Sequence, residues 1–259
     1  MHAHPSDKHK HKHFDSLPRP LVVMENAWPT GSSTGWHSHP KGQLLYATDG
    51  VMEVHSDIGS WVVPPNRALW MLAGLRHNVT MSGDVLMRTA YIDETKIANL
   101  PAESCVINVS PLLRELLVEA VRIAPTGLVE GREALLLDLL VCELRVSSTL
   151  PLHLPMPVDT RICSICEALS RRPSDTSSAA DWAQSIGVAE RTLHRLFIKE
   201  TGMTFAQWRE QARLLHALRR IAEGDRLIDV ALDCGYASPS AFAAMFRRHF
   251  KTPPSSFYR

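Results

Sequence analysis

Short apolar runs separated by turn residues fill the chain from Leu21 to Ile92. This spacing is typical of a small antiparallel barrel or sandwich. In QLLYATDGVMEVHSD (residues 43–57), two alternating runs flank Asp49-Gly50, a dipeptide that favours a tight hairpin turn. The prolines after Trp61-Val-Val end another strand, because proline has no amide hydrogen for a sheet ladder. We therefore predict an all-β barrel over residues 18–95.

After Pro101 the apolar period becomes helical. Two segments, SPLLRELLVEAVRIA (110–124) and EGREALLLDLLVCELRVSS (130–148), each place leucines on one broad face, namely Leu112, Leu113, Leu116 and Leu117 with Val121, and Leu135, Leu136, Leu139, Leu140 and Leu144. These helices either cover their own barrel or leave a face for a second subunit. The Pro-rich segment LPLHLPMPVD (150–159) disfavours helix and predicts an extended linker. We assign dimerisation helices and linker to residues 96–157.

The pattern of the last hundred residues predicts helices, and this region contains an internal repeat. DWAQSIGVAERTLHRLF (181–197) and DVALDCGYASPSAFAAMF (229–246) share an aspartate, an alanine two residues later and a glycine six residues after the aspartate, at an offset of 48. Beyond the turn the offset is 49, so the apolar positions pair as Leu193 with Phe242, Phe197 with Phe246, and Trp208 with Phe257. The unit is therefore duplicated.

Each copy has the layout of a helix-turn-helix. A small residue, Ala183 or Ala231, allows close helix crossing, and a glycine, Gly187 or Gly235, suits the turn between the helices. Apolar residues four apart bury one face of the second helix, which leaves the opposite face for another contact.

The exposed faces of the two second helices differ in chemistry. The first offers Arg191, His194 and Arg195, with Lys199 behind them, and arginine donates in a fork to guanine O6 and N7. The second offers the short side chains of Ser240, Ala241 and Ala244, followed by Arg247, Arg248 and Lys251. Solvation alone would explain one such helix face, but two in duplicate favour DNA. We expect direct base readout mainly from the first helix, with a close contact from Ser240, Ala241 and Ala244, and phosphate contacts from Lys199, Arg247, Arg248 and Lys251.

Residues 158–259 resemble the DNA-binding domain of AraC/XylS-family transcription regulators. The resemblance rests on the two motifs, on TFAQWREQARLLHALRRIAEG (204–224) as the helix that links them, and on the terminal FKTPPSSFYR (250–259). It implies that the two recognition helices enter successive major grooves of promoter DNA. The two-domain layout and the polar residues of the first half suggest that the regulator responds to a ligand, and the leucine-rich helices suggest that it is a dimer. We expect RNA polymerase as a further partner if the protein is an activator, and no membrane partner.

Candidate site chemistry in the first half centres on GWHSHPKGQ (35–43). Residues two apart in a strand face one side, so His37, His39 and Gln43 can converge, and His77 in AGLRHNV can reach them from another strand. The pattern resembles the cupin fold, except that Gln43 stands where the cupin motif has a glutamate and Leu72 where it has a proline. Without an anionic ligand, His37, His39 and His77 would hold a divalent metal less tightly. Both a metal site and a polar effector pocket formed by His37, His39, Gln43 and His77 stay open, and we favour the effector pocket.

Composition adds few constraints. The net charge of +1 divides into −3 over residues 1–157 and +4 over residues 158–259, which suits a polyanion partner for the second half. The His-rich residues 1–17 predict a solvated, disordered tail and carry no signal-peptide core, so we expect a cytoplasmic protein. Five scattered cysteines suggest reduced thiols, and we expect the Cys163-x-x-Cys166 pair to be buried on a predicted helix as small apolar side chains.

We conclude that the sequence describes a sequence-specific DNA-binding transcription regulator and not an enzyme. Two alternatives remain at this point. One is a metal-dependent, dioxygenase-like cupin enzyme that uses His37, His39 and His77. The other is a constitutive DNA-binding protein with an inert barrel. No glycine-rich phosphate loop, nucleophile elbow or H-E-x-x-H motif occurs in the sequence.

Overall fold

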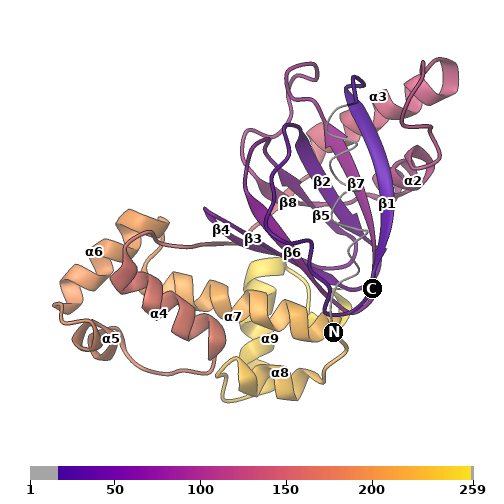
Figure 1. Cartoon of the computed structure of the whole chain (residues 1–259). Coiled ribbons are helices and arrows are strands. Elements are labelled where there is room, and N and C mark those ends of the chain that lie inside the picture. The colour runs from indigo at the N-terminus through magenta and orange to yellow at the C-terminus, as the bar shows by residue number, and fades with distance from the viewer. Residues whose placement is uncertain (1–16, 258–259) are drawn as a thin grey trace. The chain divides into compact units, whose positions relative to one another are not determined.

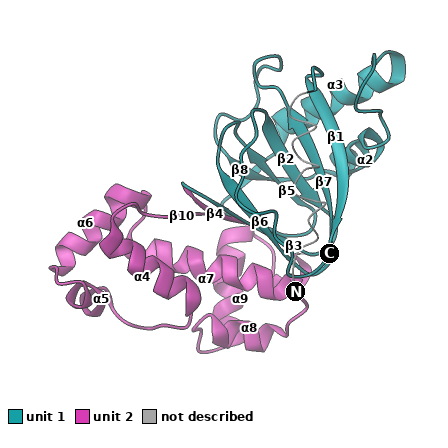
Figure 2. Cartoon of the chain, viewed as in Figure 1, with its two compact units in different colours: residues 1–57, 63–152 teal, residues 58–62, 153–259 magenta. Residues whose placement is uncertain are grey.

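The computed structural model describes residues 17–257 (Figure 1). The predicted tail, apart from Leu17, and the last two residues of the terminal FKTPPSSFYR segment lie outside the described residues. The chain forms two compact units, one of residues 1–57 and 63–152, the other of residues 58–62 and 153–259 (Figure 2).

Unit 1 is the β-rich domain that the alternating pattern predicts. Its six-stranded sheet has the order β1-β7-β2-β5-β8-β9, and all the pairs are antiparallel. The strands are β1 (Leu21–Trp28), β2 (Gly42–Ala47), β5 (Arg67–Met71), β7 (Val85–Ile92), β8 (Cys105–Asn108) and β9 (Thr149–Leu150). A second antiparallel pair joins β3 (Val51–Ser56) to β6 (His77–Ser82).

The hairpin expected around Asp49-Gly50 is wrong. Gly50 does adopt a positive φ of 70°, but β2 pairs with β5 and β7, whereas β3 pairs with β6. All six residues of β2 are buried, so this strand needs sheet neighbours on both edges, and the turn instead carries the chain to the other sheet. The turn is packed tightly, because a Cβ on Gly50 would lie 2.6 Å from Val85 Cγ2.

Two helices, α2 (Pro111–Ala120) and α3 (Gly131–Val146), cover one face of the six-stranded sheet (Figure 1). Ser110 caps α2 by accepting a hydrogen bond from Leu113 N at 3.0 Å. The shared core joins Leu113, Leu116, Leu117, Leu136, Leu140 and Leu144 of the helices to Leu44, Trp70 and Ile92 of the sheet. Leu135 and Leu139 of α3 stay 70% and 42% exposed, so part of the leucine face does not cover the sheet.

Unit 2 contains the predicted helical domain. Its helices are α4 (Thr160–Arg171), α5 (Ala179–Ser185), α6 (Glu190–Thr201), α7 (Phe205–Ala222), α8 (Leu227–Asp233), α9 (Pro239–Phe250) and the 3-10 turn η2 (Pro254–Ser256). Helices α5–α6 and α8–α9 are the two helix-turn-helix copies, and α7 links them (Figure 1). The unit also includes β10 (His153–Pro155), which pairs with β4 (Gly59–Val63).

The repeat explains the packing of unit 2. Every matched apolar pair of the two copies is buried, as are Ala183 and Ala231 at the helix crossings. The turn glycines Gly187 and Gly235 have φ values of 69° and 75°, a region that most side chains avoid. The two copies therefore share the same helix crossing and turn. Capping boxes at Ser178 and Thr204 fix the starts of α5 and α7, whereas α8 begins without a side-chain cap from the described residues.

The cysteines give a first prediction about this packing. Cys166 and Cys234 are buried, and burial raises the pKa of both thiols, that of Cys234 to about 12, so little reactive thiolate forms. Cys163 is only partly buried, contrary to expectation, and Cys142 is exposed. We expect iodoacetamide at pH 8 to alkylate Cys142 first and to leave Cys166 and Cys234 unmodified.

Mass spectrometry of labelled peptides measures this order. The urea-unfolded chain provides the control, in which all five thiols react alike. If Cys234 reacted as fast as Cys142 in the native protein, the second helix-turn-helix would not be packed as described.

Candidate DNA interface and histidine pocket

The exposed face of α6 carries the arginines expected to read bases. Arg191 and Arg195 lie one turn apart and are exposed, while Leu193 and Phe197 are buried beneath them. Within residues 17–257, neither arginine makes a hydrogen bond or an ion pair. The side chain of His194 lies 3.4 Å from Glu190, and Lys199 lies 3.4 Å from Glu200. Because Arg191 and Arg195 have no such partner in the part of the chain that the structure describes, all N–H donors of their guanidinium groups are available to an external acceptor.

The exposed face of α9 carries shorter side chains than that of α6, as its sequence predicts. Ser238 caps the helix by accepting from Ala241 N at 3.2 Å, and Ser240, Ala241 and Ala244 are exposed. Side chains this short allow the helix backbone to approach a partner closely.

The cations at the end of α9 are not equivalent. Arg247 is exposed and has no ion pair with any residue that the structure describes. Arg248 donates to Glu210 of α7, which also pairs with His249 Nε2 at 2.7 Å. Burial opposes the ionisation of Glu210, but hydrogen bonds from His249 and Arg248 outweigh it and lower the pKa of the carboxyl. Glu210 therefore holds Arg248 in place, a contact that the sequence did not reveal.

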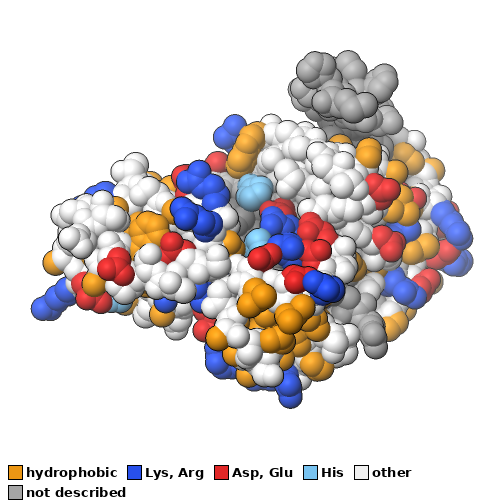
Figure 3. Space-filling model, turned by 90° about the horizontal axis from the view of Figure 1, so that it is seen from below, with side chains coloured by type: hydrophobic (Ala, Val, Ile, Leu, Met, Phe, Trp, Pro, Cys, Tyr) orange, Lys and Arg blue, Asp and Glu red, His pale blue; other side chains and the backbone are white. Residues whose placement is uncertain are grey.

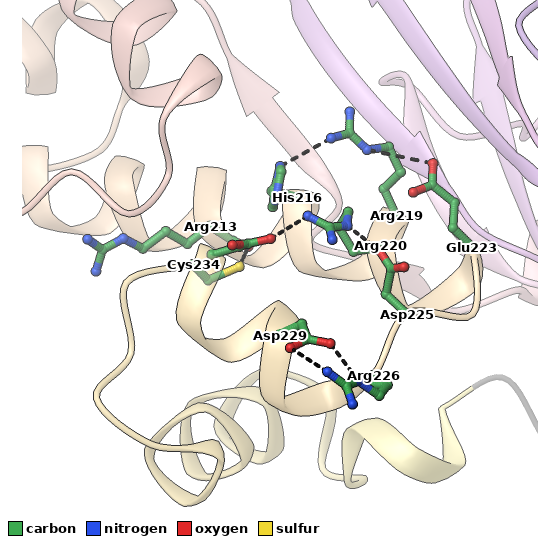
Figure 4. Close-up of polar contacts among 10 residues, drawn as sticks. Arg213, His216, Arg219, Arg220, Glu223, Asp225, Arg226, Asp229 and Cys234 are labelled. Carbon is green, nitrogen blue, oxygen red and sulfur yellow. Dashed lines mark hydrogen bonds and ion pairs between the residues drawn. The ribbon is translucent and has the colours of Figure 1, made fainter.

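Other arginines of unit 2 serve its internal structure. Arg220 of α7 binds both Asp225 and Asp233, and Arg226 binds Asp229 at 2.8 Å (Figure 4). The Arg220–Asp233 pair fixes α8 to the linking helix, and the Arg226–Asp229 pair lies within the first turn of α8. Arg213 donates to the carbonyl oxygens of Pro173 and Asp175, at 2.7 and 2.8 Å, and so holds the loop before α5. On the face drawn in Figure 3, Lys and Arg side chains are interleaved with Asp and Glu.

The predicted pocket residues converge in unit 1. The backbones of His37 and His77 form an isolated antiparallel bridge, in which each N–H donates to the other carbonyl, with N···O distances of 2.9 and 2.8 Å. The ring centroids lie 4.3 Å apart for His37 and His77, and 4.8 Å apart for His37 and His39. His39 and His77 are buried and His37 is partly exposed.

Hydrogen bonds to the backbone set the tautomers of two of these rings. His37 Nδ1 donates to Gly35 O and His77 Nδ1 to Leu75 O, both at 2.8 Å. A carbonyl only accepts, so in each neutral ring Nδ1 carries the proton and Nε2 the lone pair.

Gln43 and Tyr91 lie next to the histidine cluster. The two residues are cross-strand partners on β2 and β7, and the Tyr91 ring lies 5.0 Å from that of His39. Gln43 is buried, and within residues 17–257 its Oε1 has no hydrogen-bond partner. A buried acceptor without a donor is costly, so the site suits a ligand that donates a hydrogen bond to Gln43.

The donor set is chemically able to hold a cation. Ligand atoms of His37, His39 and His77 lie within 4.8 Å of one another. A tetrahedral Zn²⁺ needs nitrogens about 3.3 Å apart, so a metal would draw the rings closer together. Three neutral imidazoles and an amide oxygen fit such an ion without supplying an anionic ligand.

Two antiparallel sheets with a cluster of histidines, followed in the sequence by a duplicated helix-turn-helix, define a DNA-binding protein with an attached ligand-binding domain. Comparison with protein families agrees, because residues 22–136 match the AraC-like ligand binding domain and residues 182–259 match a helix-turn-helix domain. The chain belongs to the AraC family of helix-turn-helix transcription regulators.

Two relatives support this membership. The chain is 31% identical to the HTH-type transcriptional regulator NimR of Escherichia coli over 221 residues, which cover 85% of this chain and 81% of that protein. It is 34% identical to the HTH-type transcriptional regulator RipA of Corynebacterium glutamicum over 103 residues, 40% of this chain and 31% of that one.

A solved structure of ToxT from Vibrio cholerae aligns with a TM-score of 0.38 and 10% identity, over 93% of this chain and 98% of that one. Within residues 17–257, no helix combines the length and the apolar character that a membrane span requires.

Proposed function

We propose that this regulator reads promoter DNA with α6 and α9 in successive major grooves, and that α6 supplies most of the base readout. The observation that carries the proposal is the pair of exposed arginines on α6, Arg191 and Arg195, without partners in the described part of the chain. Bidentate arginine contacts discriminate guanine from other bases. His194 completes the readout face of α6, and Ser240, Ala241 and Ala244 give α9 a close contact with its groove.

Phosphate contacts form the second part of the proposal, with Lys199, Arg247, Arg248 and Lys251 as donors. We expect Arg247→Ala to weaken binding to operator and scrambled DNA alike, because phosphates carry no sequence information. The slope of log K against log salt should fall by about 0.9 for the lost contact. Arg248→Ala should act in the same direction but less strongly, because Glu210 already engages part of that guanidinium.

Fluorescence anisotropy titrations at several salt concentrations measure both slopes. Glu210→Gln is the matched variant, since it releases Arg248 and should strengthen binding to both DNAs. A loss confined to operator DNA in Arg247→Ala would contradict the assignment of this residue to phosphate.

For unit 1 we propose an effector pocket formed by His37, His39, Gln43 and His77. The support comes from the buried Gln43 oxygen and the converging imidazoles. We infer a sensing role for residues 18–95 and not catalysis, in a cytoplasmic protein that acts on promoter DNA. Turnover that depends on added iron would favour the dioxygenase-like alternative, and operator affinity unchanged by any metabolite would favour an inert barrel.

A metal-binding variant tests the chemistry of this pocket. We expect Gln43→Glu to tighten Zn²⁺ binding at least about tenfold, because the carboxylate restores an anionic ligand beside three imidazoles. Competition titration with a chromophoric chelator measures the affinity, on protein whose His-rich N-terminal segment has been removed. His39→Ala in the Gln43→Glu background should abolish the gain. Stoichiometric metal in the purified wild-type protein would instead show that the pocket is already a metal site.

We further propose that residues 96–157 make the protein a homodimer and connect it to the DNA-binding residues 158–259. The exposed leucines of α3 support this, since an apolar helix face in water favours a partner. If the protein activates transcription, RNA polymerase is the further partner.

A further inference from the structure

The segment between the two halves of the chain contains a docked strand and not only a spacer. β10 pairs antiparallel with β4 in the register His153 with Trp61, Leu154 with Ser60, and Pro155 with Gly59. The rings of His153 and Trp61 stack, with centroids 4.6 Å apart and an interplanar angle of 22°. Burial lowers the pKa of His153, which keeps this ring neutral. Residues 58–62 thus belong to the helical unit although they come from the sensing half of the sequence (Figure 2).

Helix α7 holds the same strand by side-chain hydrogen bonds. The indole Nε1 of Trp208 donates to Pro155 O at 2.7 Å, and Gln211 Nε2 donates to His153 O at 3.2 Å. Trp208 is fully buried and Gln211 nearly so, and both hydrogen bonds are partly shielded from water. Because α7 links both helix-turn-helix copies, β10 is tied directly to the element that sets their spacing.

The position opposite Pro155 requires glycine. Gly59 has a φ of 144°, and a Cβ there would lie 2.5 Å from both His153 Nε2 and Leu154 O. Any side chain at this position would push β10 away from β4. Substitution of Gly59 therefore offers a specific means of undocking the strand.

On its N-terminal side, β4 follows β3, which pairs with β6, the strand that carries His77 of the histidine pocket. Ser56, the last residue of β3, is the register partner of His77 on β6, and His77 forms the backbone bridge to His37. Only two residues, Asp57 and Ile58, separate Ser56 from Gly59 at the start of β4. A change in the register or spacing of the pocket strands therefore reaches β4 through a very short connection.

We propose that β10 is the coupling strand of this regulator, which transmits the state of the histidine pocket through β4 to α7. The proposal rests on the proposed function of the pocket and of the double helix-turn-helix. In physical terms, β10 is in equilibrium between a docked and an undocked state. A pocket ligand shifts this equilibrium when it binds the two states with different affinity.

A double-mutant cycle tests the coupling without knowledge of the effector. The four proteins are wild type, His37→Ala, Gly59→Ala and the double variant, and the DNA is an operator selected from random duplexes by the wild type. We expect His37→Ala to change operator affinity about fivefold in the wild-type background, and to have almost no effect once Gly59→Ala has undocked β10. Gly31→Ala is the matched control, since Gly31 also has a positive φ, 77°, but a Cβ there would meet no atom within 4 Å.

Hydrogen exchange of the β10 amides, those of His153 and Leu154, supplies the structural readout. Protection should be present in the wild type and in Gly31→Ala, and lost in Gly59→Ala. An equal effect of His37→Ala in both backgrounds, no effect in either, or unprotected β10 amides in the wild type would overturn the coupling strand. Failure of the proposed DNA-binding function is distinguishable, because the wild type would then select no operator and both proposals would fall.

Discussion

Arg195→Ala should remove much of the preference for operator over scrambled DNA while leaving the fold intact. The lost guanidinium is exposed and has no partner in the described part of the chain, so its removal leaves no buried charge unpaired. A bidentate arginine–guanine pair accounts for about 1–3 kcal/mol of discrimination, which is roughly a 5- to 150-fold loss of operator affinity. Competition binding against a scrambled duplex, together with a thermal unfolding curve, measures both quantities.

Arg171→Ala provides the control for this substitution. Arg171 is an exposed arginine in the last turn of α4, outside both helix-turn-helix copies, so it removes the same charge from the same unit. We expect it to lower the affinity for both DNAs slightly and equally. If Arg195→Ala behaved like Arg171→Ala, base readout by α6 would be wrong.

Leu139→Glu should dissociate the proposed homodimer and weaken operator binding by about a hundredfold or more, since dimerisation gives the second DNA-binding unit a high effective concentration. Leu135 and Leu139 lie one turn apart on α3 and are exposed, whereas Leu136, Leu140 and Leu144 of the same helix are in the core. A carboxylate at an exposed position costs the monomer little but is strongly unfavourable in an apolar interface. Sedimentation velocity and operator titration measure the two effects.

Leu128→Glu is the matched control for the dimer test. Leu128 is 82% exposed in the loop before α3, so the same substitution adds the same charge without entering the α3 face. It should leave the sedimentation coefficient unchanged. A Leu139→Glu protein that still sediments as a dimer would place the interface elsewhere.

The duplicated unit was predictable in detail because its signals are local or repeated. The turn glycines, the small residues at the helix crossings and the apolar positions four apart recur in both copies, and each one took its expected place. The exposed face of α6 followed from the same periodicity, since burial of Leu193 and Phe197 leaves Arg191 and Arg195 outside.

Contacts between distant segments were not predictable in this way. Asp49-Gly50 has the composition of a hairpin turn, but the choice between pairing β2 with β3 and crossing to another sheet depends on β5, β6 and β7. The Pro-rich segment 150–159 predicted an extended linker. The docking of its strand β10 depends on Gly59 and Trp208, which are far away in sequence. Likewise, nothing local to Arg248 indicates its pairing with Glu210.

The convergence of the histidines was only partly predictable from the sequence. Period-two spacing placed His37 and His39 on one side of the chain, but only the bridge between His37 and His77 brings the third imidazole to them. The missing glutamate was visible in the sequence. That its replacement, Gln43, keeps a buried oxygen without a hydrogen-bond donor in residues 17–257 required the structure.

The central claim, that α6 and α9 read successive major grooves, is tested most directly by hydroxyl-radical footprinting on the selected operator. Each half-site should show two protected patches on one face of the DNA, about one helical turn apart. Arg195→Ala should weaken the patch assigned to α6 and leave the spacing of the two patches unchanged. A single protected patch per half-site, or two patches on opposite faces of the duplex, would contradict the account.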